Sequence, residues 1–376
     1  MALIPRLRRA LLSWYDAHRR ELPWRARRDP YAVLVSEFML QQTRVETVLR
    51  YYDGFLAAFP DLHALAAASE DDVLRAWQGL GYYGRARRLR ALAQVVRERW
   101  GGELPEDAAR LRELPGVGPY LAGAVASIAF GRREAAVDGN VRRVLGRLFD
   151  LDTPSPARLE RLAARLLDPR RPGDWNQALM ELGATVCRPR APRCAACPLA
   201  AWCRAHRRGR VKQRPAARRR AAPAEVERAT LVRVRDGRVA LERRPPGGLL
   251  GGLYGFPGED LPAGAGEAAA RRALSDAWGA PPAALAAWPP YRHVFTHRAW
   301  TVRPFLWAEA GGAEAGTGAG RTQRKRAAGA GASEAGASEA GLLWLGRAEL
   351  AAAPLPRAFE PLRRVLLEGS RDILLM

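Results

Sequence analysis

Residues 114–120 read Leu114-Pro115-Gly116-Val117-Gly118-Pro119-Tyr120, and small and apolar residues follow as far as Phe130. Proline is favoured in the first turn of a helix and Gly131 is a typical residue to end one, so the sequence predicts a helix over residues 119–130. The two glycines allow the backbone to turn tightly and to approach a partner closely. The N–H groups that are free at a helix start suit a phosphate. A Gly-x-Gly turn is also common in plain helix connections, so a phosphate contact is one of two interpretations of this stretch.

Helical periodicity extends on both sides of this turn, from residue 1 to about residue 205. Downstream, apolar residues recur with the spacing of one buried helical face: Val141, Val144, Leu145, Leu148 and Phe149. Asp138 stands just before this pattern, where its carboxylate can cap the helix. Since little in this half of the chain alternates with period two, we predict an all-α domain over residues 1–205.

The next segment is strongly basic. Residues 204–220 carry nine cations and no acid, so we predict an interdomain linker over residues 206–227. A solvated tether and an arm that contacts DNA both fit this composition.

After residue 228 the pattern becomes mixed. Two β-like segments flank the turn pair Asp236-Gly237, which is typical of a hairpin, and a helical pattern covers residues 267–278. We therefore predict an α+β domain over residues 228–376. Within it, residues 309–341 are of low complexity and are predicted to form a disordered insertion.

The excess of positive charge indicates a polyanionic partner. The 376 residues contain 61 Lys and Arg against 39 Asp and Glu, a formal net charge of +22. Nucleic acid is the leading candidate and an anionic membrane is the second. All the cations except Lys212 and Lys325 are arginines, which a GC-rich genome also favours, so charge alone leaves the partner open. Because no apolar run is long enough to span a membrane and no secretion signal is recognisable, we expect a cytoplasmic protein.

The cysteines of the chain fall within 17 residues with the spacing C-x6-C-x2-C-x5-C: Cys187, Cys194, Cys197 and Cys203. Thiols this close indicate a metal site rather than disulfides. Structural zinc sites usually contain two short Cys pairs and only Cys194 and Cys197 form one here, which favours iron–sulfur over zinc without excluding zinc. The first spacer is a loop tethered at both ends, and its three arginines suggest phosphate contacts: Arg188, Arg190 and Arg193.

Glu37 lies in a stretch, residues 31–40, that is otherwise almost wholly apolar. A carboxyl group there is expected to lose solvation, which raises its pKa and keeps it protonated, as a general acid must be. The alternative interpretation is a polar position on an amphipathic helix.

Taken together, the features above resemble the helix-hairpin-helix DNA glycosylases, and within that superfamily the sequence is similar to the MutY family of adenine glycosylases. The matching segments are Leu22-Pro23-Trp24-Arg25, Ser36-Glu37-Phe38-Met39-Leu40-Gln41-Gln42-Thr43, Gly79-Leu80-Gly81-Tyr82-Tyr83, Val137-Asp138-Gly139-Asn140, Asn176-Gln177-Ala178, Gly255-Phe256-Pro257-Gly258 and Phe295-Thr296-His297. The resemblance implies an all-α glycosylase domain with a [4Fe–4S] cluster on the four cysteines, followed by an α+β Nudix-like domain. It also implies a monomer, associated with the nucleoid, that removes adenine mispaired with 8-oxoguanine or guanine in duplex DNA.

The resemblance assigns roles to individual residues. Glu37 would protonate N7 of an adenine flipped out of the duplex, and Asp138 would stabilise the oxocarbenium-like sugar while water completes the hydrolysis. Tyr120 and Asn140 match positions that hydrogen-bond these two carboxyl groups. Trp24, Arg20 and Glu181 would line the adenine pocket.

Contacts with DNA are assigned in the same way. Gln42 and Tyr82 match residues that wedge into the base stack, although Tyr82 also fits an ordinary core or surface aromatic. Gly116, Val117 and Gly118 match the hairpin that clamps the DNA backbone. In the second domain, Phe295, Thr296 and His297 match the loop that recognises 8-oxoguanine, although Phe295 also fits a buried strand.

The distribution of lysine predicts that strand cleavage is weak. A glycosylase that also nicks the strand usually forms a Schiff base with a lysine amine, and relatives resembling endonuclease III carry that lysine at the position of Tyr120. Residues 1–211 contain no lysine at all. The alternatives are an endonuclease III-like oxidised-pyrimidine glycosylase/AP lyase and a non-catalytic iron–sulfur DNA-binding protein. A nucleotide pyrophosphohydrolase is disfavoured, because the helix at 267–278 lacks the paired glutamates that hold Mg²⁺.

Overall fold

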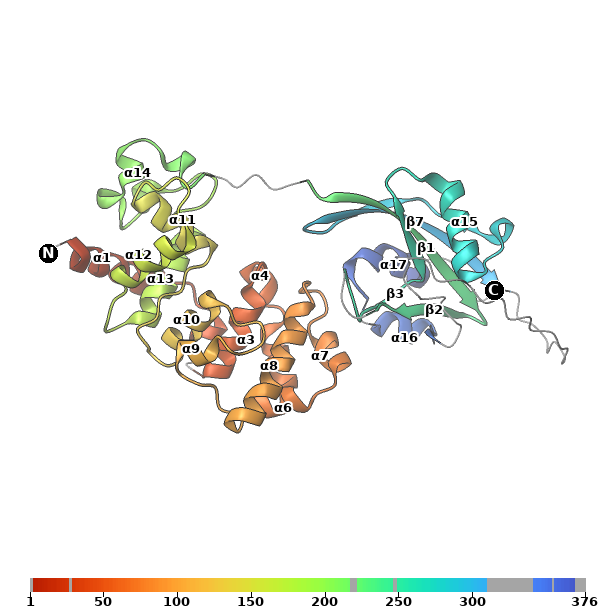
Figure 1. The fold of residues 1–376 in the computed structure, drawn as a ribbon, viewed down its shortest axis with the longest axis horizontal. Coiled ribbons are helices and arrows are strands. Elements are labelled where there is room, and N and C mark those ends of the chain that lie inside the picture. The colour runs from red at the N-terminus through yellow and green to blue at the C-terminus, as the bar shows by residue number, and fades with distance from the viewer. Residues whose placement is uncertain are drawn as a thin grey trace, which may run out of the picture. The chain divides into compact units, whose positions relative to one another are not determined.

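The computed structural model describes residues 3–26, 29–216, 222–245, 249–309, 341–353 and 355–368. The chain divides into two compact units, residues 1–219 and 220–376 (Figure 1). The insertion predicted at 309–341 falls almost wholly outside the described residues. Across the described ranges, the structure contains no helix with the length and apolar character needed to cross a bilayer.

Helices build the first unit, as predicted (Figure 1). Their bounds are α1 (Leu3–His18), α2 (Pro23–Ala26), α3 (Pro30–Leu40), α4 (Val45–Val48), α5 (Tyr52–Ala58), α6 (Leu62–Ala67), α7 (Glu70–Ala76), α8 (Gly84–Trp100), α9 (Ala108–Leu111), α10 (Pro119–Ile128), α11 (Gly139–Leu148), α12 (Pro156–Leu166), α13 (Pro172–Thr185) and α14 (Arg204–Arg207).

Helix α3 is the central helix of this unit. It begins at Pro30, where the Asp29 carboxylate accepts a hydrogen bond of 2.8 Å from the N–H of Ala32 and caps the helix. Residues 31–39 are all buried, which explains why the stretch is apolar around the whole helix rather than on one face. The only charged side chain on α3 is therefore held inside the protein.

Helices α10 and α13 each approach a neighbouring segment closely through a glycine. A Cβ on Gly123 of α10 would lie 2.3 Å from the carbonyl oxygen of Ala135, and a Cβ on Gly183 of α13 would lie 2.6 Å from Cβ of Asn140. Neither position can therefore carry a larger side chain without displacing its neighbour. The first contact places the segment that leads into α11 against α10, and the second places the start of α11 against α13.

Part of the predicted linker folds onto the helical unit. The buried Asp150 carboxylate accepts hydrogen bonds from Arg208 Nη1 at 2.9 Å and Arg214 Nε at 3.0 Å. Arg147 Nε donates to the carbonyl of Arg214 at 3.0 Å, and strand β1 begins at Ala224. Both ends of the predicted linker, residues 206–227, therefore belong to the folded units. Arg208 and Arg214 contact the helical unit, and residues 224–227 are part of β1. The composition of the segment could not reveal that these arginines contact the helical unit, because their acceptors lie more than fifty residues earlier in the chain.

A mixed sheet forms the second unit. Its elements are β1 (Ala224–Arg235), β2 (Arg238–Arg243), β3 (Tyr254–Gly255), β4 (Gly258–Pro262), α15 (Gly266–Trp278), β5 (Ala286–Ala287), β6 (Tyr291–Val294), β7 (Arg298–Glu309), β8 (Leu342–Leu345), α16 (Arg347–Ala352) and α17 (Glu360–Glu368). The long strands β1 and β7 are parallel, and the other pairings are antiparallel. The predicted hairpin turn is present, with positive φ at Asp236 and Gly237.

Helices cover both faces of this sheet (Figure 1). Alternate residues of β1 point to opposite sides: Leu231 packs with Leu274 of α15, whereas Val232 packs with Leu362 of α17. The second unit therefore has two apolar layers, and the predicted α+β class is confirmed.

Candidate active site

A cavity of about 790 Å³ lies in the helical unit, bordered by α2, α3, α10, α11, α12 and α13. All seven predicted catalytic and pocket residues line it, together with the predicted wedge residue Gln42, although they come from segments far apart in the sequence: Arg20, Trp24, Glu37, Tyr120, Asp138, Asn140 and Glu181. Glu37 and Asp138 therefore face one space, 101 positions apart in the chain. The remaining predicted residues of this unit lie elsewhere on it.

Glu37 occupies the last turns of α3 and its side chain is buried, with 5% of the residue exposed. Its Oε2 accepts a hydrogen bond of 2.5 Å from the hydroxyl of Tyr120. Burial raises the pKa of Glu37 to about 7, and the nearby Asp138 carboxylate acts in the same direction. The Tyr120 hydrogen bond and the charge of Arg25 oppose the increase. At neutral pH a large fraction of this carboxyl group is protonated.

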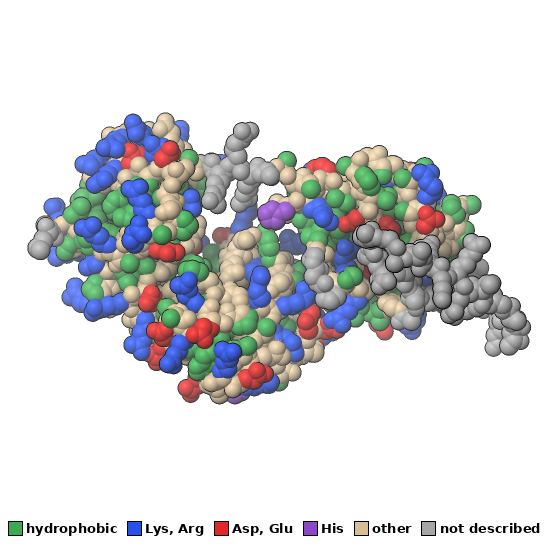
Figure 2. Space-filling model, viewed as in Figure 1, with side chains coloured by type: hydrophobic (Ala, Val, Ile, Leu, Met, Phe, Trp, Pro, Cys, Tyr) green, Lys and Arg blue, Asp and Glu red, His purple; other side chains and the backbone are tan. Residues whose placement is uncertain are grey.

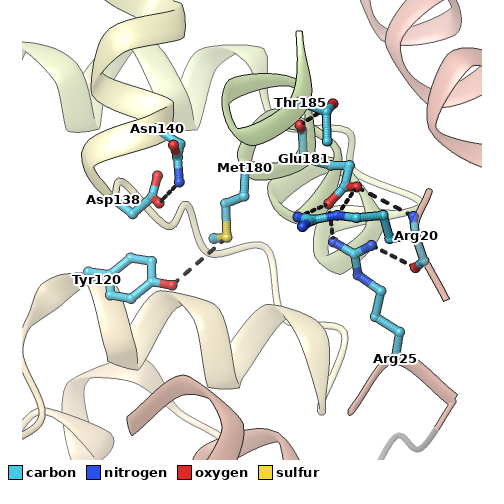
Figure 3. Close-up of polar contacts among 8 residues, drawn as sticks. All are labelled: Arg20, Arg25, Tyr120, Asp138, Asn140, Met180, Glu181 and Thr185. Atoms are coloured by element: carbon cyan, nitrogen blue, oxygen red, sulfur yellow. Dashed lines mark hydrogen bonds and ion pairs between the residues drawn. The ribbon is translucent and has the colours of Figure 1, made fainter. Parts of the chain in front are cut away.

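Asp138 is the N-cap of α11, as predicted. One carboxylate oxygen accepts the N–H of Val141 at 2.7 Å and the other accepts the side-chain amide of Asn140 at 2.7 Å. Burial raises the pKa of Asp138, while these two hydrogen bonds oppose the increase. Figure 3 shows that Asp138 and Tyr120 face the same space, with Met180 of α13 beside them. Capping fixes the direction of the carboxylate toward the cavity.

Arg143 extends this network and was missed in the sequence. Its Nη2 donates to the side-chain oxygen of Asn140 at 2.8 Å and to the carbonyl of Gly183 at 2.7 Å, and its Nε donates to the carbonyl of Cys187 at 2.7 Å. Hydrogen bonds thus connect Asp138 with the first cysteine of the cluster motif. The available signal was the i, i+3 spacing of Asn140 and Arg143 on one helical face.

Glu181 is held by two arginines at the other side of the cavity (Figure 3). It is 1% exposed, and its carboxylate accepts hydrogen bonds from Arg20 Nε at 2.7 Å and Arg25 Nη2 at 2.8 Å. Burial alone would raise the pKa of Glu181, but the hydrogen bonds and charges of the two arginines lower it. The cavity therefore brings together Glu37, whose pKa is raised to about 7, and Glu181, whose pKa is lowered and which stays ionised. Arg25 was not singled out from the sequence.

The two predicted wedge residues share an unusual backbone conformation. Gln42 has φ of 58° and Tyr82 has φ of 49°, in the left-handed region that bulky residues rarely adopt. Gln42 lies at the cavity, whereas Tyr82 is outside its lining and is 46% exposed. That exposure rules out a core position for Tyr82.

In the predicted hairpin, the structure requires glycine at position 116 but would accept a side chain at position 118. Gly116 has φ of 81°, and a Cβ there would lie 2.9 Å from Cβ of Arg88, so both conformation and space require glycine. Gly118 has φ of −93°, which any residue adopts, and apart from its chain neighbours no residue comes within 4 Å of the place where its Cβ would be. The buried Val117 anchors the turn between them. Gly118 is the N-cap residue of α10, so this open space lies at the start of that helix.

The four cysteine side chains line one pocket, together with Arg147, Arg193 and His206. The described residues contain no group of three or more His, Cys, Asp or Glu side chains suited to a single metal ion. Four cysteine thiols around one pocket are a donor set that iron–sulfur clusters and structural zinc sites both use. The residues present therefore fit an iron–sulfur cluster. Arg147 Nη1 donates a hydrogen bond to Sγ of Cys187 at 3.3 Å.

Arginines gather around these cysteines. Arg190 and Arg193 are exposed and Arg188 is half-buried, all on the loop between the first two cysteines. Figure 2 shows positively charged side chains over the part of the helical unit that contains α14. This surface has the charge needed to contact DNA phosphates.

Phe295, Thr296 and His297 form a turn between β6 and β7 in the second unit. The N–H of Phe295 donates to the carbonyl of Arg298 at 2.8 Å, so Thr296 and His297 occupy the tip and both are exposed. The Phe295 ring packs edge-on against Trp300 with 5.0 Å between centroids. Phe295 is therefore partly buried against the core at a turn rather than inside a strand.

Comparisons with known proteins agree with these features. Residues 35–169 match the profile described as HhH-GPD superfamily base excision DNA repair protein, and residues 228–364 match the NUDIX domain. The adenine DNA glycosylase of Homo sapiens is 42% identical over 316 residues, covering 68% of this chain and 58% of the relative. That of Mycobacterium tuberculosis strain H37Rv is 46% identical over 199 residues, covering 51% of this chain and 65% of the relative. The chain thus spans less than two thirds of the length of these relatives.

A solved structure is similar to the helical unit. The thermostable thymine-DNA glycosylase is 30% identical, with a TM-score of 0.52, and the match covers 55% of this chain and all of that one. The likeness agrees with the helical glycosylase architecture of residues 1–219.

Proposed function

We propose that the chain is a monofunctional adenine DNA glycosylase of the MutY family, on the premise that its helical unit matches the HhH-GPD superfamily of base excision DNA repair proteins. Its substrate is adenine paired with 8-oxoguanine or guanine in duplex DNA, and it acts as a monomer on nucleoid DNA. The observation that carries this proposal is the single cavity in which Glu37, with a pKa of about 7, faces Asp138.

The geometry supports a reaction in two steps. Glu37 gives its proton to N7 of the flipped adenine, and the C1′–N9 bond then breaks with its electron pair leaving on the base. The sugar acquires oxocarbenium character, which the negative charge of Asp138 stabilises. Water adds to C1′ and gives a proton to the Glu37 carboxylate, which restores the acid. Trp24, Arg20 and Glu181 hold the base, with Arg25 as the second partner of Glu181.

The side chains of the cavity also support base removal without strand cleavage. Tyr120 stands beside Glu37, where its hydroxyl supplies a hydrogen bond and no amine for a Schiff base. The first lysine of the chain is Lys212, so residues 1–211 contain no lysine amine that could form a Schiff base and lead to strand cleavage. The product is therefore an abasic site.

We propose that Cys187, Cys194, Cys197 and Cys203 hold a [4Fe–4S] cluster through their thiolates. The cluster supplies a structural cross-link that holds this segment in shape, and bond cleavage does not involve it. The loop arginines Arg188, Arg190 and Arg193 then contact phosphates, as do the backbone N–H groups that follow Gly118 at the start of α10.

A mispair panel tests the proposed function. Purified protein is incubated with duplexes containing A:8-oxoguanine, A:G or A:T, with and without alkali, and with borohydride on abasic DNA. We expect free adenine from the first two duplexes, strand breaks only after alkali, and no strong covalent adduct with borohydride. Adenine release that does not depend on the opposite base, or robust trapping by borohydride, would contradict the proposal.

The pH profile of adenine release should follow the Glu37 carboxyl. Since the acid must be protonated and its pKa is raised to about 7, the rate should fall by about tenfold per unit above pH 7. Tyr120→Phe removes a hydrogen bond that favours the ionised carboxylate, so the alkaline limb should move to higher pH. Tyr31→Phe, which removes a buried hydroxyl bonded to the carbonyl of Phe59, should leave the limb in place. A limb that stays unchanged or moves downward in Tyr120→Phe would refute this assignment.

The turn at Thr296 and His297 should govern the preference for 8-oxoguanine. Replacing both with alanine removes side-chain hydrogen-bonding groups from an exposed tip, so the ratio of rates on A:8-oxoguanine and A:G should fall roughly tenfold, about 1.4 kcal/mol. Leu343→Ala, at an exposed position of β8, is the control within the same unit and should keep the ratio. Equal losses on both duplexes would mean that the turn contributes to general binding rather than to recognition.

A further inference from the structure

Arg85 of α8 is a buried charge that connects the two proposed wedge loops. The residue is 3% exposed, and no carboxylate in the described part of the chain forms an ion pair with it. Its Nη1 lies within hydrogen-bond distance of the carbonyls of Phe38, Met39 and Gln41, at 2.9, 2.7 and 2.5 Å. These oxygens lie at the C-terminal end of α3, where carbonyl groups lack partners within the helix and carry partial negative charge.

The other nitrogen of the same guanidinium contacts both loops. Nη2 donates to Oγ1 of Thr43 at 2.9 Å and to the carbonyls of Gly81 and Leu80 at 3.0 and 3.4 Å. Thr43 and Gln41 flank Gln42, while Leu80 and Gly81 immediately precede Tyr82. One planar cation therefore fixes the backbone on either side of Gln42 and before Tyr82. Its Cζ also lies over the Tyr82 ring, 5.4 Å from the ring centroid, in a cation–π contact.

The two wedge residues have a backbone conformation that needs support from neighbouring groups, and Arg85 contacts both of their loops. Gln42 and Tyr82 both have positive φ, a conformation that costs non-glycine residues free energy and persists only where surrounding contacts enforce it. Among the contacts described, the Arg85 side chain is common to the two loops.

We propose that Arg85 is a positioning residue that holds the Gln42 and Tyr82 loops as one rigid element, so that both side chains enter the base stack together when the target nucleotide is flipped out. The inference rests on the proposed function, because it assigns to Arg85 the flipping step of that reaction and no part in bond cleavage. A lysine cannot replace it, since a single ammonium lacks the fork of donors that reaches both loops.

The test separates flipping from chemistry by using two substrates. One is an A:8-oxoguanine duplex, and the other contains an adenine opposite an abasic analogue, which has no pairing partner and so costs less to extrude. Arg85→Lys should lower the single-turnover rate at least tenfold on the first substrate and less than threefold on the second. Arg87→Lys, on the same helix and paired with Glu70, is the matched control and should retain both rates. A 2-aminopurine at the target position, in a Glu37→Gln background, should show a reduced flipping signal when Arg85→Lys is added.

Each outcome has one meaning. Equal losses on the two substrates, or no loss on either, would overturn the inference while leaving the proposed function standing. Absence of adenine release by the unmodified protein on both substrates would instead refute the proposed function. If Arg85→Lys lowers the melting temperature too far for assay, Thr43→Val removes one contact beside Gln42 without leaving a buried charge unsatisfied. It should give the same selective defect in smaller degree, and an equal effect on both substrates would overturn the inference.

Discussion

Replacement of Glu37 by glutamine is expected to lower the single-turnover rate of adenine release from an A:8-oxoguanine duplex by roughly 10³-fold, within the range that general acid catalysis supplies. Glutamine keeps the size of the side chain and can still accept the hydrogen bond from Tyr120, but it has no proton to give to the base. Duplex affinity should therefore change only a few-fold, because phosphate contacts supply most of the binding.

The control for this prediction is Glu98→Gln, the same change at an exposed position of α8. It should retain the rate and the affinity of the unmodified protein. Rapid adenine release by Glu37→Gln would mean that another group acts as the acid. Loss of affinity in parallel with the rate would point to misfolding, which a melting curve would reveal.

Replacement of Asp138 by asparagine is expected to reduce the same rate by roughly 10²- to 10³-fold, as expected when an electrostatic stabiliser of the transition state is removed. Asparagine caps helices about as well as aspartate, so α11 should keep its start and its position beside α13. What is lost is the negative charge next to the sugar. The melting temperature should therefore change little while the rate falls.

Asp107→Asn provides the matched control, because Asp107 is likewise an N-cap aspartate, at α9, and does not line the cavity. That variant should have normal activity. If Asp138→Asn retained the rate within a few-fold, the second carboxylate would serve only to cap the helix, and the two-carboxylate mechanism would be wrong.

The part of the site that could be predicted from the sequence is the part with a local signature. A lone acid in an apolar stretch predicted the buried Glu37, and an aspartate before a helical pattern predicted the cap at Asp138. The cysteine spacing predicted one shared site. These signals depend on residues a few positions apart, and the helical first unit and α+β second unit followed from periodicity in the same way.

Contacts between segments far apart in the chain could not be predicted, because no pattern among neighbouring residues indicates them. Arg25 reaches Glu181 across 156 positions and Arg85 reaches Phe38 across 47, so neither role follows from neighbouring residues. The arginines near residue 210 have the composition of a tether, yet Arg208, Arg210 and Arg214 all form ion pairs with Asp150. In an arginine-rich chain, the residue type alone does not distinguish a solvated charge from a structural one.

Excision of 7-deazaadenine opposite 8-oxoguanine tests the central claim most directly. This base has a carbon in place of N7, so it can be flipped and bound but cannot accept a proton there from Glu37. We predict that the protein binds this duplex within a few-fold of the adenine duplex and releases no base from it over many half-lives of the normal reaction. Release of 7-deazaadenine at a rate close to that of adenine would contradict the account.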